Sequence, residues 1–137
     1  MNHRLIAVAV IASFVAACSS DSAMEPIVTS VAGTWTLTEV NGKALPYVYG
    51  ASDPRLELIA KQYVISPAGT FTTSYTLRGT DLDGTVTTST ISDAGTSTLE
   101  SNTVTFVYRS DGSVVTAHVT PTRMTIYGAV TQLFTRQ

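Results

Sequence analysis

The sequence contains few of the residues on which enzyme and metal chemistry most often depends. Among its 137 residues there is one cysteine, Cys18, and there are two histidines, His3 and His118. One cysteine excludes an internal disulfide, and two imidazoles are too few for a three-histidine metal cluster. Charge is scarce as well: eight Lys and Arg residues stand against ten Asp and Glu residues, for a formal net charge of -2. Because the basic residues are scattered singly, we expect no binding to nucleic acid.

Long hydrophobic runs are also missing. No apolar run in the sequence reaches the roughly 18 to 20 residues that a membrane-spanning helix needs. Hydrophobic residues nevertheless make up 44% of the chain and recur through its whole second half, which excludes a disordered protein. A chain of this length folds as one small domain at most.

The N-terminus has the pattern of an export signal. Residues 2–4 are polar and include Arg4, and residues 5–17 are thirteen apolar or small residues, which is the length of the hydrophobic region of a signal peptide. The run ends in Val15-Ala16-Ala17-Cys18, an aliphatic residue and two small residues before the only cysteine. This motif resembles the lipobox of bacterial lipoproteins.

The resemblance implies that residues 1–17 are a signal peptide that is removed. Cys18 would then carry a diacylglycerol thioether and an acylated α-amino group, which anchors the protein to membrane lipid. Ser19, where an Asp would favour the inner membrane, implies an exported, lipid-anchored protein of the bacterial outer membrane. Two alternatives remain, namely an ordinary secretory signal and a buried free thiol in a protein that merely begins with apolar residues.

A polar, serine-rich segment with little to bury follows at residues 18–30. We expect it to be a flexible tether that holds the folded domain, residues 31–137, off the lipid surface.

The domain reads as all-β. Thr is its dominant residue, and with Val, Ile, Tyr and Phe it fills segments that alternate apolar and polar with period two. The predicted strands are residues 34–40, 56–65, 71–78, 85–91, 96–100, 103–109, 114–120, 124–127 and 130–136. Residues typical of tight turns separate them at 41–42, 66–69, 83–84, 93–95, 101–102, 111–112 and 121–122. Short turns predict that neighbouring strands pair antiparallel, as an up-and-down meander.

Alternation also assigns the faces of these strands. Phe71, Thr73, Tyr75 and Leu77 share one face, and the same pattern holds for residues 103–109. A meander of eight or nine such strands without a covering helix buries its apolar face best as a closed barrel, which we favour over a two-layer sandwich. Residues 41–54 form the one long connection, either a lid or a simple crossover loop.

Gly33-x-Trp35 opens the first predicted strand, and Arg136 closes the last. This pair resembles the Gly-x-Trp signature and last-strand Arg of the lipocalin superfamily. Residues 33–46 also resemble the opening of the small lipocalin-like domains of bacterial lipoproteins. The resemblance implies a small barrel in which Trp35 seals the closed end and Arg136 packs over it. Such packing is physically reasonable, because a guanidinium can stack on an indole while it donates to backbone carbonyls.

Candidate catalytic groups are few. We interpret His118 as a hydrogen-bonded or solvated strand residue, and Asp81-Leu82-Asp83-Gly84 as a hairpin turn rather than a calcium loop. Adventitious calcium binding by Asp81 and Asp83 remains an alternative. The acids Glu39, Glu57 and Glu100 lie among outward-looking positions. We therefore expect no catalytic residues, no metal site, no cofactor and no enzymatic activity.

Aromatic residues offer the better case for binding. An aromatic-lined barrel mouth would bind a flat or acyl ligand, whereas a small barrel can also fill its interior with the same rings. The predicted lining is Tyr47, Tyr49, Phe71, Tyr75, Phe106 and Tyr108. The first functional hypothesis is a non-enzymatic lipoprotein that binds a small apolar or amphipathic molecule. The alternative is a structural or protein-interaction module of the envelope, with a filled barrel, that uses its Thr-rich outer face or an edge strand.

Overall fold

The computed structural model describes residues 24–50, 52 and 54–137, and the predicted signal peptide and Cys18 lie outside the described residues. This part of the chain contains ten β-strands and no helix. The strands are β1 (Gly33–Val40), β2 (Lys43–Ala44), β3 (Tyr47–Gly50), β4 (Arg55–Ile65), β5 (Thr70–Thr80), β6 (Val86–Glu100), β7 (Thr103–Tyr108), β8 (Val114–Val119), β9 (Arg123–Ile126) and β10 (Gln132–Arg136).

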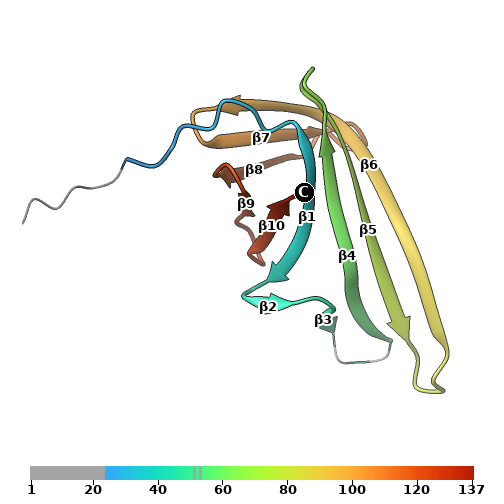
Figure 1. Ribbon diagram of the computed structural model, residues 1–137. Helices are drawn as coiled ribbons and strands as arrows, with labels where there is room; N and C mark the ends of the chain where they lie inside the picture. Colours follow the sequence, from blue (N-terminus) through green and yellow to red (C-terminus); the bar gives the residue numbers. More distant parts are fainter. Residues whose placement is uncertain (1–23, 51, 53) are drawn as a thin grey trace, which may run out of the picture.

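The strands form one antiparallel sheet that closes on itself (Figure 1). Its order is β2-β1-β10-β9-β8-β7-β6-β5-β4-β3, and an additional pairing joins β1 to β4. Residues 33–36 of β1 pair with residues 62–65 of β4, and this contact closes an eight-stranded barrel. The predicted fold class, an antiparallel up-and-down meander closed into a small barrel, is therefore confirmed.

The long connection between β1 and β4 is a crossover that carries two short strands. β2 pairs with the end of β1, and β3 pairs with the start of β4. The segment therefore borders the end of the barrel at which β1 and β4 separate.

The sequence-based division of β6 is wrong. Residues 85–91 and 96–100 were expected as two strands with a turn at 93–95, but β6 runs unbroken from Val86 to Glu100. Gly95 is a glycine because of close packing: a Cβ there would lie 2.0 Å from the carbonyl oxygen of Val107 and 2.8 Å from Cε1 of Phe71. A glycine inside a strand often marks such an approach of neighbouring groups.

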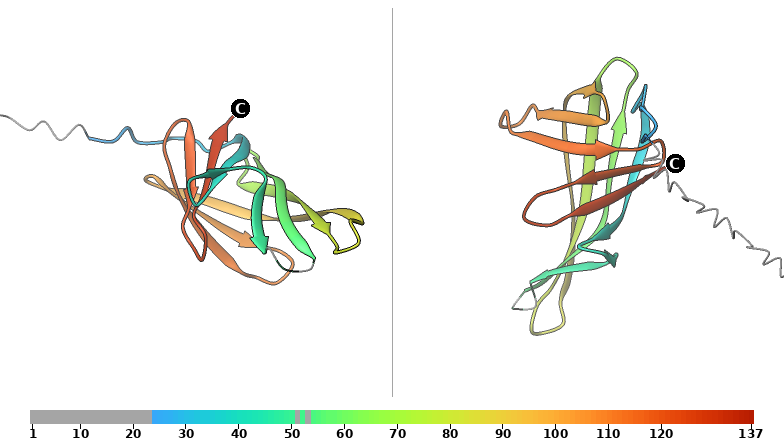
Figure 2. Two further views of the ribbon diagram at one scale, coloured as in Figure 1. Left: turned by 90° about the horizontal axis from the view of Figure 1, so that it is seen from below. Right: turned by 90° about the vertical axis from the view of Figure 1, so that its left-hand side faces the viewer.

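The long hairpin of β5 and β6 projects beyond the barrel. The two strands pair along residues 70–80 and 86–96, whereas β7 pairs with β6 only over residues 95–100. β4, β5 and β6 therefore continue past the shorter strands β7 to β10, as both views in Figure 2 show. We call β3 together with the projecting residues 55–60 and 76–90 the extension. Its tip is a hairpin turn, as predicted, in which Gly84 N donates to Asp81 O at 2.9 Å.

The core fills the middle of the barrel. Phe71, Thr73, Val104 and Phe106 are buried while Thr72 is exposed, so the predicted faces of these strands are confirmed. The largest buried rings are Trp35, Tyr63, Phe71, Phe106 and Phe134. Each side chain of this size contributes roughly 1.5–3 kcal/mol on burial, so these rings supply much of the stability of the barrel.

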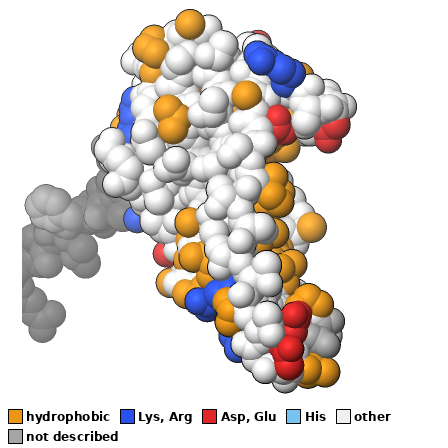
Figure 3. Space-filling view, turned by 90° about the vertical axis from the view of Figure 1, so that its right-hand side faces the viewer, with side chains coloured by type: hydrophobic (Ala, Val, Ile, Leu, Met, Phe, Trp, Pro, Cys, Tyr) orange, Lys and Arg blue, Asp and Glu red, His pale blue; other side chains and the backbone are white. Residues whose placement is uncertain are grey.

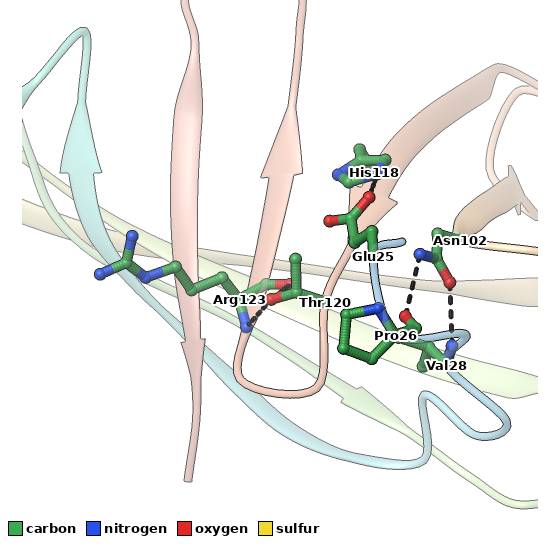
Figure 4. A network of polar contacts seen from close by, with 7 residues as sticks. All are labelled: Glu25, Pro26, Val28, Asn102, His118, Thr120 and Arg123. Carbon is green, nitrogen blue, oxygen red and sulfur yellow. Dashed lines mark hydrogen bonds and ion pairs between the residues drawn. The ribbon is translucent and has the colours of Figure 1, made fainter. Parts of the chain in front are cut away.

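The residues before β1 do not form a free tether over their described part. Val28 is only 7% exposed and belongs to the core, against the expectation that residues 18–30 have little to bury. Asn102, in the turn between β6 and β7, accepts a hydrogen bond from Val28 N at 2.8 Å and donates one to Pro26 O at 3.1 Å. Glu25 lies 3.2 Å from His118 Nε2 (Figure 4). We call residues 24–32 the N-terminal strap, because these contacts hold it against the barrel.

Candidate ligand-binding cleft

Gly33, Trp35 and Arg136 meet at the barrel end where β1 begins. Trp35 is fully buried, and its indole N–H donates to Val31 O at 2.8 Å. Trp35 pairs with Arg136 across β1 and β10, and the guanidinium carbon lies 5.3 Å from the indole centroid. The Arg136 guanidinium also donates to the carbonyls of Ala32 and Ser30. These contacts tie the first strand, the last strand and the strap together.

Gly33 is the residue that this arrangement requires. Its φ of 135° lies in a region that side chains disfavour, and a Cβ there would lie 3.4 Å from Nε of Arg136. Gly33, Trp35 and Arg136 therefore have structural roles at the barrel end where β1 begins.

Two of the six residues predicted as ligand lining lie in the core. Phe71 is 2% exposed, Phe106 is fully buried, and their ring centroids are 5.0 Å apart. Tyr63 packs on both, at 5.7 Å and 4.9 Å. The structure therefore places Phe71 and Phe106 where they fill the barrel. This matches the expectation that a small barrel uses such rings for its own packing.

The other predicted tyrosines lie toward the opposite end. Tyr47 and Tyr49 on β3 make an edge-to-face pair at 5.3 Å, and the Tyr47 hydroxyl accepts a hydrogen bond from Asn41 Nδ2 at 3.1 Å. Tyr49 and Tyr75 line one surface cleft, and Tyr75 and Tyr108 line a second.

The first of these, the apolar cleft, has a volume of about 350 Å³. It is lined by Tyr49, Leu56, Leu58, Lys61, Tyr75 and Leu77. Hydrophobic side chains gather along the extension in the space-filling view, with acidic side chains near its tip (Figure 3). The cleft lies where the extension leaves the barrel, because its residues come from β3, β4 and β5.

The second, the polar cleft, has a volume of about 430 Å³. It is lined by Lys61, Thr73, Tyr75, Ile91, Ser92, Asp93, Tyr108, Ser110, Asp111 and Ser113. Lys61 and Tyr75 line both clefts, so the two hollows meet at these side chains.

Lys61 is the residue that the sequence analysis missed. Its ammonium donates to Gln132 Oε1 at 2.9 Å and lies 5.5 Å from the ring centroid of Tyr63 and 5.9 Å from that of Phe134. Burial lowers the pKa of Lys61 to about 8. A signal was present in the sequence, because Lys61 alternates with Tyr63 and Ile65 and so belongs to the inward face of its strand.

Tyr49, Tyr63 and Tyr108 remain neutral at physiological pH. The hydroxyls of Tyr63 and Tyr108 share a hydrogen bond, and burial raises the pKa of both side chains. Burial also raises the pKa of Tyr49, and the neighbouring Tyr47 and Tyr75 add to the effect. The cleft walls therefore offer phenol hydroxyls and ring faces rather than phenolates.

Glu57 differs from its predicted outward, solvated position. It is 5% exposed and lies between Arg78, whose Nη2 is 2.7 Å from Oε2, and Arg55, whose Nη2 is 3.0 Å from Oε1. The hydrogen bond from Arg78 is the main reason why the pKa of Glu57 is lowered. Glu57 is therefore held ionised between two guanidinium groups, which suits a structural ion pair and not a general acid.

The remaining candidate groups lie outside both clefts. His118 faces Glu25 of the strap. Asp83 accepts a hydrogen bond from Thr85 N at 2.8 Å, which lowers its pKa and stabilises the hairpin turn. Residues 24–50, 52 and 54–137 contain no group of three His, Cys, Asp or Glu side chains placed to hold a metal ion.

Comparison of the chain with protein-family models, with curated proteins and with solved structures finds no match. Within the described part of the chain no helix is both long and apolar enough to cross a membrane.

Proposed function

We propose that this protein is a lipid-anchored, non-enzymatic lipoprotein of the bacterial cell envelope that binds a small apolar or amphipathic molecule at the open end of a lipocalin-like barrel. The observation that carries the proposal is the pair of clefts that meet at Lys61 and Tyr75. Their volumes fall in the range of small-molecule sites, and apolar walls next to a few polar groups are typical of such sites.

The non-enzymatic part of the proposal is supported by where Glu57 and His118 lie. Glu57 is neutralised by two arginines, and His118 is turned toward the strap. Neither group lines either cleft. Of the tyrosines that line them, Tyr49 and Tyr108 hold their protons at neutral pH, because burial raises the pKa of both.

Ligand uptake is tested by native mass spectrometry of the protein purified gently from cells. A discrete extra mass that is lost on denaturation is expected, and Tyr75→Ala should remove it while the far-ultraviolet circular dichroism stays that of a β-protein. Tyr127→Ala is the matched control, because Tyr127 is 68% exposed and lies in neither cleft. An unchanged extra mass in Tyr75→Ala would refute this site.

The anchor is tested separately through Cys18 and its motif. Labelled palmitate should enter the wild-type protein and not Cys18→Ser, and the labelled protein should sediment with outer-membrane vesicles. Label retained in Cys18→Ser, or labelled protein confined to the inner membrane, would contradict the corresponding half of the proposal.

A second candidate, an interaction module, is favoured by the open edge of β6. Arg109 N donates to Ala94 O at 2.8 Å, and among the described residues no strand pairs with residues 86–93 on that side. Residues 86–92 carry no charge, and an uncharged edge of this length can accept an added strand from another protein. A photo-crosslinker at Thr90 should then trap one defined partner in cells, whereas the same group at exposed Thr116 on β8 should not. Identical products from both positions would exclude this candidate.

A further inference from the structure

The ammonium of Lys61 is the one basic group that lines the two clefts. It projects from β4, and its position is fixed by the hydrogen bond to Gln132 on β10. Among the described residues, none of the ion pairs within 4.0 Å involves Lys61. An ammonium has three donors, and Gln132 Oε1 takes one of them, so two remain for an incoming group.

The carboxylates nearest to this site already have partners of their own. Asp93 accepts hydrogen bonds from Ser110 Oγ at 2.5 Å and from Ala94 N at 2.7 Å. Asp111 accepts one from Ser113 N at 2.8 Å, which lowers its pKa. Both acids line the polar cleft, so its lining contains two carboxylates as well as the Lys61 ammonium.

Buried charges in proteins are usually paired, because an ammonium that leaves water without a counter-ion loses solvation. The lowered pKa of Lys61, about 8, reflects that loss. A site that keeps such a group beside an apolar hollow matches a ligand with a negative charge at one end and an apolar body at the other.

We infer that the ligand of this site is an amphiphilic carboxylate whose acidic head pairs with Lys61 while its apolar body lies in the apolar cleft. This inference rests on the proposed function and specifies its ligand. A single negative charge fits one ammonium with free donors. Asp93 and Asp111 disfavour a doubly charged head such as a phosphate monoester, because like charges repel across the polar cleft.

The contacts expected for the body of the ligand follow from the cleft walls. Leu56, Leu58 and Leu77 supply aliphatic surface, and Tyr49 and Tyr75 supply ring faces. The Tyr75 hydroxyl can donate to the head, whereas one of the Tyr63 and Tyr108 hydroxyls already donates to the other. The packed rings below prevent deeper entry.

The experiment compares three probes of equal chain length by calorimetry at pH 7, namely decanoate, decanol and decylamine. In the wild-type protein decanoate should bind about tenfold or more tightly than decanol, which is the usual strength of a charge-assisted hydrogen bond. Lys61→Met should abolish this difference while decanol still binds. Lys43→Met, which removes the only other lysine, an exposed residue on β2, should leave it unchanged.

A second measurement needs only the wild-type protein. As pH rises from 7 to 9.5 the Lys61 ammonium loses its proton, so decanoate affinity should fall toward that of decanol, and decanol affinity should stay constant. Decanol binding and circular dichroism together show whether Lys61→Met is folded.

The outcomes separate the inference from the proposed function. Equal binding of decanoate and decanol to wild-type protein, tightest binding of decylamine, or a carboxylate preference that survives in Lys61→Met would overturn the inference and leave the cleft as a ligand site. If none of the three probes binds, the proposed function itself fails.

Discussion

Replacement of Lys61 by Met tests how much the Lys61 ammonium lowers the free energy of unfolding. Burial lowers the pKa of Lys61 from 10.5 to about 8, so between these pH values the unfolded chain holds a proton that the folded chain has released. The stability of the wild-type protein therefore rises with pH in this window. From pH 7.5 to 9.5 the expected gain is about 2 kcal/mol, at roughly 1.4 kcal/mol for each pH unit above the folded-state pKa.

Urea unfolding at pH 7.5, 8.5 and 9.5 measures this gain in wild type, Lys61→Met and Lys43→Met. The wild type and Lys43→Met should share the rise, and Lys61→Met should lack it and be the more stable protein at pH 7.5. The series stops at pH 9.5 because the raised pKa values of Tyr63 and Tyr108 reduce stability once unfolded tyrosines ionise, near pH 10. If the free energy of unfolding changes with pH in the same way in wild type and Lys61→Met, the lowered pKa of Lys61 is refuted.

Three further predictions concern the frame around the site. Gly95→Ala should lower the free energy of unfolding in urea by about 3 kcal/mol, because the added Cβ would lie 2.0 Å from the carbonyl oxygen of Val107. Gly50→Ala is the control and should change it by less than about 0.5 kcal/mol, because a Cβ there meets nothing within 4 Å. Asn102→Ala should cost about 1–2 kcal/mol and speed amide exchange in the strap; unchanged exchange would mean that the strap docks without this side chain. Arg136→Met should shift the fluorescence emission of Trp35, the only tryptophan, to longer wavelength and lower the free energy of unfolding by about 1–3 kcal/mol. An unaltered emission spectrum would show that the guanidinium does not shield the indole from water.

Strand alternation was enough to predict the barrel and its inner faces. Phe71 and Thr73 alternate with exposed residues, and so do Val104 and Phe106, because one face of each strand must leave water. The meeting of Trp35 and Arg136 was implied by the resemblance of Gly33-x-Trp35 and Arg136 to the lipocalin signature, and the two residues do pair across β1 and β10. These features depend on local patterns that the sequence displays directly.

The continuity of β6 could not be read in the same way. Asp93-Ala94-Gly95 has the composition of a tight turn, yet Gly95 is there because the backbone of β7 and the ring of Phe71 approach it. Both situations select glycine, and only the pairing of distant strands distinguishes them. The burial of Val28 depends likewise on Asn102, 74 residues further along the chain.

Two charged residues within the strand region show why the site itself was missed. Glu57 and Lys61 lie four residues apart on β4, and the bulge between Leu58 and Ala60 changes the register between them. Alternation with Tyr63 and Ile65 places Lys61 on the inward face, but across this bulge it gives no reliable face for Glu57. Pairing with Arg55 and Arg78 makes Glu57 a stabilised ion pair, and such partners are visible only in the folded sheet.

The contrast between these two charges supports the open end as the site of function. Glu57 has two guanidinium partners, so its charge is compensated within the chain. Lys61 has one amide oxygen, two aromatic faces and a lowered pKa but no carboxylate partner among the described residues, although a methionine of similar length would avoid the cost. A fold that pairs its buried Glu57 and leaves the partly buried Lys61 without a carboxylate beside an apolar hollow has a reason to keep this lysine, and the anionic ligand that we propose would supply the missing partner.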